Sequence, residues 1–209
     1  MNKNKKTAPI AVFDSGLGGM SVLRQLILLM PQENYIYFGD SAHAPYGTKT
    51  AEEVCALTSA CIEVLLKKEA KAVVLACNTA TSVTVNLLRE KYPRLPVIGI
   101  EPAIKPAVEA HPGGRILVLA TAMTLQEQKF ALLLDRYKDA AEIISLPAPG
   151  IVEFVEQGVT AGPELDAYLQ ELLSPFRRQK ARWHRPGLHP LPFRNGKHPQ
   201  SHRRRRGYL

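Results

Sequence analysis

One stretch of sequence decides the fold: Ile10-Ala11-Val12-Phe13-Asp14-Ser15-Gly16-Leu17-Gly18-Gly19. Its first four residues are apolar, which predicts a buried strand, and the glycine-rich turn that follows predicts a tight bend into a helix. We expect that helix over Ser21 to Met30, because Pro31 cannot continue it. The stretch therefore predicts a strand–turn–helix unit, which is the building block of an α/β fold.

The same alternation of short apolar segments and longer amphipathic segments continues to about residue 176. Further strands are expected over Tyr35–Phe38, Ala72–Ala76, Val97–Ile100, Arg115–Ala120 and Ile143–Leu146. Further helices are expected over Thr50–Lys68, Thr81–Lys91, Leu125–Tyr137, Ile151–Gln157 and Glu164–Leu173. Strands that alternate with helices predict parallel sheets flanked by helices on both faces.

The predicted fold class is α/β, with two similar domains of which the second is incomplete. A length of 209 residues suits one large domain or two small ones. We assign the first domain to residues 8–101, a Pro- and Gly-rich linker to 102–114, and a partial second domain to 115–176. Helical and strand periodicity then disappears, so residues 177–209 are predicted to be a basic, irregular tail.

The net charge of +8 belongs to the tail and not to the predicted domains. Eleven of the 27 Lys and Arg residues follow Phe176, together with none of the 19 Asp and Glu residues. The first 176 residues therefore carry a net charge of −3, which does not favour nucleic-acid binding. A nucleic-acid binder that uses the run Arg203–Arg206 is an alternative, but the tail contains few aromatic residues beside it.

Cysteine content and hydropathy predict a cytoplasmic protein. An odd, sparse set of three cysteines favours free thiols over a disulfide framework. The polar, basic N-terminus does not resemble the apolar core of a signal peptide, and no apolar run has the length of a membrane span.

Polar side chains gather where the predicted strands end. In open parallel sheets, ligands bind at the carboxyl ends of the strands, so these residues are the candidate site. They are Asp14 and Ser15, Tyr46 and Gly47, Cys77, Asn78 and Thr79, and Thr121 and Thr124. Hydroxyl and backbone N–H groups can bind a carboxylate and Asp can bind an ammonium group, so the set suits a small zwitterion.

Among the cysteines, Cys77 is the candidate for chemistry, because it ends a buried strand directly before a helix. The helix dipole and nearby N–H groups are expected to lower its thiol pKa. Cys55 and Cys61 are six residues apart in one helix and are predicted to be structural. A dinucleotide site at the glycine turn is an alternative, but Ser21 stands where that motif has a third glycine or an alanine.

Taken together, these motifs resemble the glutamate racemase family of amino-acid racemases. The resemblance runs from about Ile10 to Phe176 and rests on four motifs in the same order and spacing. They are Val12–Gly19, Tyr37-Phe38-Gly39-Asp40, Pro45-Tyr46-Gly47 and Ala76-Cys77-Asn78-Thr79-Ala80.

The resemblance implies a cofactor-independent isomerase without a metal, which interconverts L- and D-glutamate and supplies D-glutamate for peptidoglycan. Glutamate would bind between two facing domains, with Cys77 exchanging a proton with Cα and a second thiol acting on the opposite face. The resemblance implies that Asp14, Ser15, Tyr46, Gly47, Asn78 and Thr79 bind substrate, with Thr121 and Thr124 as less direct candidates. A homodimer is a possible partner arrangement, and no membrane association is expected. The alternative functions are a racemase for aspartate or another amino acid, or a non-catalytic relic that binds glutamate.

The sequence departs from the family where the second thiol belongs. The family has Gly-Cys-Thr-His-Tyr-Pro after the helix that here ends near Leu173, and this chain has no cysteine after Cys77. When Trp183–Phe193 is back-translated and shifted by one nucleotide, the codons permit Gly-Thr-Val-Leu-Gly-Cys-Thr-His-Tyr-Pro in full. We infer a reading-frame change near Lys180 to Trp183, so that the tail is out of frame.

The frame hypothesis predicts that this polypeptide has low stability and racemises glutamate very weakly or not at all, since one of two thiols is missing. Restoring the frame after about codon 180 should restore racemisation, measured with both purified chains by circular dichroism of glutamate. Comparable rates in the two chains would contradict the hypothesis.

Overall fold

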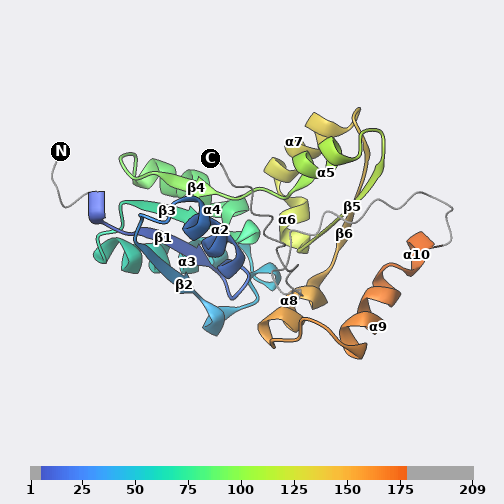
Figure 1. Cartoon of the computed structure of the whole chain (residues 1–209), viewed down its shortest axis with the longest axis horizontal. Coiled ribbons are helices and arrows are strands. Elements are labelled where there is room, and N and C mark those ends of the chain that lie inside the picture. The colour runs from blue at the N-terminus through green and yellow to red at the C-terminus, as the bar shows by residue number, and fades with distance from the viewer. Residues whose placement is uncertain (1–5, 178–209) are drawn as a thin grey trace, which may run out of the picture.

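The computed structural model describes residues 6–177, which form two lobes with a different sheet in each (Figure 1). The first lobe contains four strands and the second contains two among the described residues. Both sheets are parallel and are flanked by helices, so the predicted α/β class is confirmed. The predictions for residues 178–209 lie outside the described part of the chain.

The first sheet has the strand order β2-β1-β3-β4, and every neighbouring pair is parallel. Its strands are β1 (Ile10–Asp14), β2 (Tyr35–Gly39), β3 (Ala72–Leu75) and β4 (Val97–Gly99). All five residues of β1 are buried, as expected for a central strand covered on both faces. In register, Phe13 lies between Phe38 of β2 and Leu75 of β3, so these strands end at one edge of the sheet.

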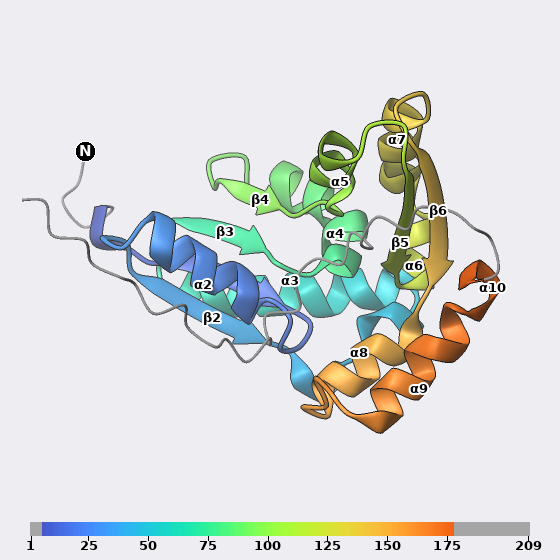
Figure 2. The ribbon, with the colours of Figure 1, turned by 45° about the vertical axis from the view of Figure 1, so that its right-hand side comes forward.

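Three helices cover this sheet: α2 (Met20–Leu29), α3 (Ala51–Lys67) and α4 (Asn78–Lys91). Side chains of β1 alternate between the two faces, as strand geometry requires. Ala11 and Phe13 join the core beneath α3 and α4, whereas Ile10 and Val12 pack against α2. Figure 2 shows α2 on one side of the sheet and α3 on the other. Two short 3₁₀ helices, η1 (Ser41–His43) and η2 (Tyr46–Thr48), connect β2 to α3.

The second lobe is built on β5 (Arg115–Ala120) and β6 (Glu142–Pro147), which pair in parallel. Its helices are α5 (Ile104–Ala110), α6 (Ala122–Gln126), α7 (Gln128–Tyr137), α8 (Pro149–Glu156), α9 (Pro163–Leu172) and α10 (Ser174–Arg177). A separate core forms where Ile104 and Val108 of α5 meet Phe130 and Leu133 of α7. Phe154 and Tyr168 join α8 to α9, with ring centroids 5.6 Å apart.

Three helix predictions differ from the structure. Helix α5 lies inside residues 102–114, which the sequence suggested were a linker, because Ile104 and Val108 are one turn apart and are both buried. The single helix expected over Leu125–Tyr137 is divided into α6 and α7, because Glu127 has an extended backbone. Helix α4 begins at Asn78, three residues earlier than predicted, because Cys77 caps it. The domain boundaries themselves stay a prediction.

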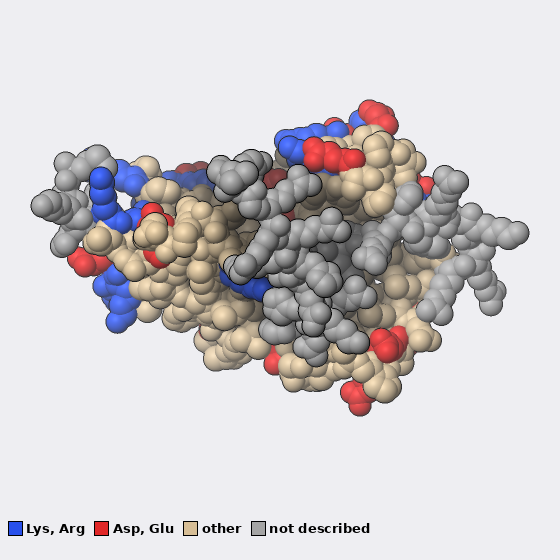
Figure 3. Space-filling model, viewed as in Figure 1, with Lys and Arg blue, Asp and Glu red and all other residues tan. Residues whose placement is uncertain are grey.

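The surface of the described residues carries both signs of charge. On the face shown in Figure 3, Lys and Arg side chains lie beside Asp and Glu side chains at the left end of the molecule and along its upper edge. Within residues 6–177 no helix combines the length and the apolar character that a membrane crossing needs.

Helix α3 offers a test of local stability, because Thr50 and Glu53 form a reciprocal capping box at its N-terminus. Replacing Thr50 by Ala should lower the free energy of unfolding by about 1 kcal/mol, since the Glu53 N–H loses its acceptor. The Thr50→Ser variant keeps the acceptor and should resemble the wild-type chain in urea denaturation. An Ala variant as stable as the Ser variant would show that the cap does not stabilise the fold.

Candidate active site

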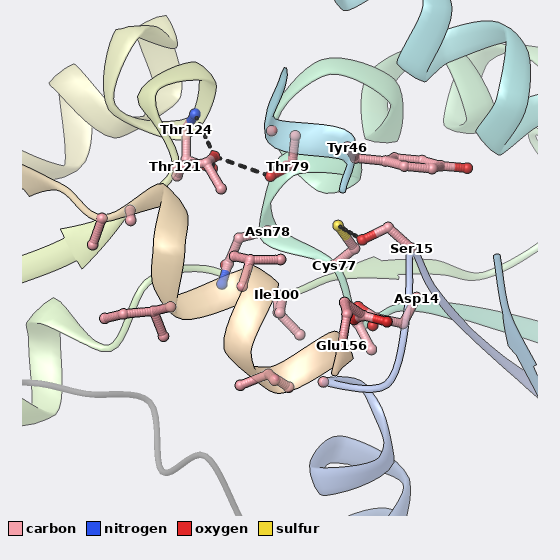
Figure 4. A pocket seen from close by; sticks show the side chains of 18 of the residues that line it. Asp14, Ser15, Tyr46, Cys77, Asn78, Thr79, Ile100, Thr121, Thr124 and Glu156 are labelled. Atoms are coloured by element: carbon pink, nitrogen blue, oxygen red, sulfur yellow. Dashed lines mark hydrogen bonds between the residues drawn. The ribbon is translucent and has the colours of Figure 1, made fainter. Parts of the chain in front are cut away.

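A cavity of about 230 Å³ lies between the two lobes, at the carboxyl ends of β1, β3 and β5. All nine site residues predicted from the sequence line it, and Figure 4 shows how they converge. Asp14, Ser15, Tyr46, Gly47, Cys77, Asn78 and Thr79 belong to the first lobe, and Thr121 and Thr124 to the second. The structure thus brings the predicted residues together, and their roles stay predictions.

Cys77 is the N-cap residue of α4 and its thiol faces the cavity. The Sγ atom accepts a hydrogen bond from the N–H of Ala80 at 3.4 Å and lies 3.2 Å from the hydroxyl of Ser15. Two consecutive elements therefore fix this thiol: the end of β3 and the first turn of α4. Cys55 and Cys61 do not line the cavity, in line with the structural roles expected for them.

The expected direction of the Cys77 pKa is wrong. Burial raises the pKa of this thiol to about 11, and the negative charge of Asp14 adds to the increase. Hydrogen bonds from Ser15 and the N–H of Ala80 lower the pKa, but their combined effect is smaller. The helix N-terminus is present as predicted, yet loss of solvation outweighs it, so the thiol is protonated near neutral pH.

Asp14 is a buried carboxyl at the end of β1. Its Oδ2 accepts a hydrogen bond from the N–H of Gly16 at 3.0 Å. Burial raises its pKa to about 6, with a further increase from Glu156, although the N–H groups of Gly19 and Gly16 lower it. The turn can wrap this closely only because residue 19 is glycine: a Cβ there would lie 2.7 Å from the Cβ of Asp14.

Tyr46 takes part in the site through its backbone more than through its phenol. The ring is buried, and its hydroxyl donates a hydrogen bond of 2.7 Å to Asp40. Figure 4 shows the ring pointing away from Thr79 and Thr121. The next residue, Gly47, packs directly against Thr121 of the other lobe. A Cβ added at position 47 would lie only 2.6 Å from the Cγ2 methyl group of Thr121.

Three threonine hydroxyls connect the lobes. The Thr79 Oγ1 lies 3.1 Å from the Thr121 Oγ1, which in turn lies 3.0 Å from the Thr124 Oγ1. Thr121 also caps α6 by accepting a hydrogen bond from the N–H of Thr124 at 3.3 Å. All three residues line the cavity, and their hydroxyls are possible donors to a carboxylate.

Asn78 carries an unused acceptor. Its Oδ1 atom is buried and has no hydrogen-bond partner among the described residues. A buried acceptor without a donor costs free energy, so a ligand that donates a hydrogen bond here would recover it. Among the groups of an amino acid, the ammonium group is such a donor.

Glu156 is a charged lining residue that the sequence interpretation missed. It ends α8 in the second lobe, and its Oε1 accepts a hydrogen bond of 3.0 Å from the N–H of Leu17 in the first. The two residues are 139 positions apart, and α8 itself suggests only an amphipathic helix. Local sequence contains no sign of this contact, because it depends on how the lobes face each other.

The profile of the family described as Asp/Glu/Hydantoin racemase matches residues 20–182, which is most of the chain. The chain belongs to this family. Among curated proteins, it is 53% identical over 176 residues to glutamate racemase of Clostridium perfringens, which covers 84% of this chain and 68% of that protein. It is 57% identical over 166 residues to glutamate racemase of Clostridium novyi, covering 79% and 64%.

Solved structures of glutamate racemases also resemble the chain. The Escherichia coli enzyme in complex with L-glutamate and the activator UDP-MurNAc-Ala has a TM-score of 0.74 at 34% identity, covering 83% of this chain and 65% of that one. The Francisella tularensis enzyme in complex with D-glutamate has a TM-score of 0.70 at 30% identity, covering 84% and 66%. This chain therefore spans about two thirds of the length of its relatives.

These comparisons confirm the family that the four motifs indicated. The family consists of isomerases, and the relatives named above are glutamate racemases. The two-domain α/β architecture of the structural relatives also agrees with the predicted fold class. The matches cover the two lobes described above and leave the frame hypothesis for the tail as a prediction.

The raised pKa of Asp14 predicts that ionisation of this buried carboxyl destabilises the fold above about pH 4. The carboxyl binds a proton more tightly when folded, with a pKa of about 6 against 3.8, so stability falls as pH rises through this window. The loss amounts to about 3 kcal/mol for a shift of this size. Asp14→Asn should lack that fall and be more stable than the wild-type chain at pH 7, in urea titrations at several pH values.

Equal stability of the two proteins at about pH 3 serves as the control, because the Asp14 carboxyl is then largely neutral in both the folded and the unfolded chain. If the wild-type chain and the Asn variant show the same pH dependence between pH 4 and pH 7, the buried carboxyl is not its source.

Proposed function

We propose that this chain binds glutamate in the cavity between its lobes and that Cys77 exchanges a proton with the substrate Cα. The observation that supports this most directly is the meeting of a buried thiol and a buried carboxylate, Cys77 and Asp14, in one cavity lined by hydroxyls. The complexes of the F. tularensis and E. coli relatives with D- and L-glutamate support the choice of substrate.

In this proposal the α-ammonium group of glutamate binds at Asp14 and Asn78. Asp14 is a carboxylate that burial makes harder to ionise, and an ammonium beside it would stabilise the ionised form. The ammonium would also donate to the Asn78 Oδ1, which has no partner among the described residues of the empty site. The Asp14 carboxylate would thereby gain a counter-charge, and the Asn78 Oδ1 would gain a hydrogen-bond donor.

The substrate carboxylates would be held by neutral donors. The hydroxyls of Ser15, Thr79 and Thr121 line the cavity, together with the backbone of Tyr46 and Gly47. Hydroxyl and N–H groups can follow the charge that moves into the α-carboxylate when Cα loses its proton. Because the donors are fixed in a largely apolar cavity, they stabilise that charge without solvent reorganisation.

Proton transfer requires that Cys77 first become a thiolate. The charge of Asp14 holds the thiol pKa up, so an ammonium that offsets this charge lowers the pKa when the substrate binds. The thiolate can then accept the proton of Cα on the face that it contacts and return it to the same face. Each transfer moves one proton between carbon and sulfur and needs no electron acceptor.

Racemisation by the family's two-thiol mechanism needs a second acid on the opposite face. The other two cysteines do not line the cavity, and residues 178–209 contain no cysteine. We therefore propose proton exchange on one face, with net racemisation absent or very weak in this polypeptide. Aspartate is the alternative substrate, and a panel of amino acids in the same binding assay would separate the two.

The reducing cytoplasm is the proposed location, since all three thiols of the described residues are free. A homodimer is part of the proposal as well. Exposed apolar residues on α2, such as Leu28 and Leu29, offer a surface for it. Multi-angle light scattering of the purified chain measures the oligomeric state.

Solvent exchange tests the proposed chemistry directly. In ²H₂O the wild-type chain should replace the Cα proton of one glutamate enantiomer by deuterium, as followed by proton NMR. The Cys77→Ser variant should lose this exchange by several orders of magnitude, because a hydroxyl is a far weaker acid and base pair for carbon than a thiol.

Cys61→Ser is the matched control, since it removes a buried thiol that does not line the cavity. Its exchange rate should stay close to the wild-type rate if the variant folds, which far-UV circular dichroism reports. Exchange that persists in Cys77→Ser would overturn the role of this thiol.

A further inference from the structure

Glu156 reaches from one lobe into the polar edge of the other. It is the last residue of α8, and its Oε1 accepts a hydrogen bond from the Leu17 N–H in the turn after β1. Its carboxylate lies so close to Gly16 that a Cβ at that position would be 1.9 Å from Oε1. A glycine is therefore required at position 16 for this contact, and the carboxylate rests on the backbone of the turn.

The carboxylate of Glu156 shares the cavity with that of Asp14. Both line it, and Figure 4 shows the two side chains next to each other. Their mutual influence is large enough for Glu156 to raise the pKa of Asp14. The lining residues in the described part of the chain include no Lys, Arg or His, so no side-chain cation balances this pair.

Two neighbouring carboxylates in a cavity favour a cationic ligand group between or beside them. Glutamate has one cationic group, its α-ammonium, which has three N–H donors. The bond to Leu17 occupies one oxygen of Glu156 and orients the carboxylate, which leaves its second oxygen for a ligand.

We propose that Glu156 is a specificity-determining residue whose carboxylate binds the substrate α-ammonium together with Asp14. The inference rests on the proposed function, because it requires that glutamate bind in this cavity. The ammonium is held from both lobes, by β1 of the first and α8 of the second. The pair thereby selects α-amino acids over dicarboxylates of the same length, which bring no cation to the two carboxylates.

Glutamate and glutarate form the matched ligand pair for the test, since glutarate lacks only the ammonium group. Isothermal titration calorimetry of the full chain measures the dissociation constant of each. The Glu156→Gln variant removes the charge but keeps a carbonyl oxygen that can accept from the Leu17 N–H. It should weaken glutamate binding about tenfold or more, and leave glutarate binding unchanged or tighter, because a charge-assisted hydrogen bond is lost.

Glu153→Gln is the control in the same helix. Glu153 is exposed and does not line the cavity, so its removal changes the net charge equally without touching the site. It should leave both dissociation constants within about twofold, as expected for a distant, screened charge. Far-UV circular dichroism of each variant reports whether the fold is retained.

The outcomes separate this inference from the proposed function. If the wild-type chain binds no glutamate, the proposed function fails and the role of Glu156 fails with it. If glutamate binds but Glu156→Gln weakens both ligands equally, or neither, Glu156 only joins the lobes and the specificity role is overturned.

A measurement on the wild-type chain covers the case of a variant that does not fold. Glutamate should shift the NMR amide signal of Leu17 more than glutarate does. An ammonium group bound to the Glu156 carboxylate would change the hydrogen bond that this carboxylate accepts from the Leu17 N–H. Equal shifts for the two ligands would overturn the proposal without any substitution.

Discussion

The site depends on parallel pairing of β1 with β2 on one side and β3 on the other. Parallel register brings the carboxyl ends of these strands to a single edge, so that Asp14 and Cys77 become neighbours although 63 positions separate them. Each residue then starts a different local structure, a glycine turn in one case and helix α4 in the other. A buried hydrophobic sheet thus positions two polar groups that local sequence alone could not bring together.

Burial raises the pKa values of these two polar groups and makes their ionised forms less stable. The pKa of the Asp14 carboxyl rises to about 6 and that of the Cys77 thiol to about 11, so ionisation of both groups costs more than it does in water. A ligand that supplies a positive charge would lower both pKa values at once. In the proposed function, binding of an ammonium group and activation of the thiol are therefore linked through one electrostatic interaction.

Sequence reasoning found most of the site because the rule for parallel sheets is topological. Once strands and turns were assigned, the residues after each strand followed, and all nine lie in the cavity. It failed where the answer depends on packing across the chain. The direction of the Cys77 pKa shift depends on how deeply the thiol is buried, and the contact of Glu156 with Leu17 depends on how α8 meets the turn of the other lobe. Helix α5 was missed because its apolar residues are few and lie between prolines and glycines.

The contact between Gly47 and Thr121 has a consequence for how closely the lobes can approach. Residue 47 has no side chain, and the threonine of the other lobe fills the space where one would be. A larger residue at position 47 would have to push Thr121, and with it the second lobe, away from the first. The closest approach of the lobes at this point thus depends on a residue that has no side chain, and a graded series of side chains there would vary the distance between the two lobes.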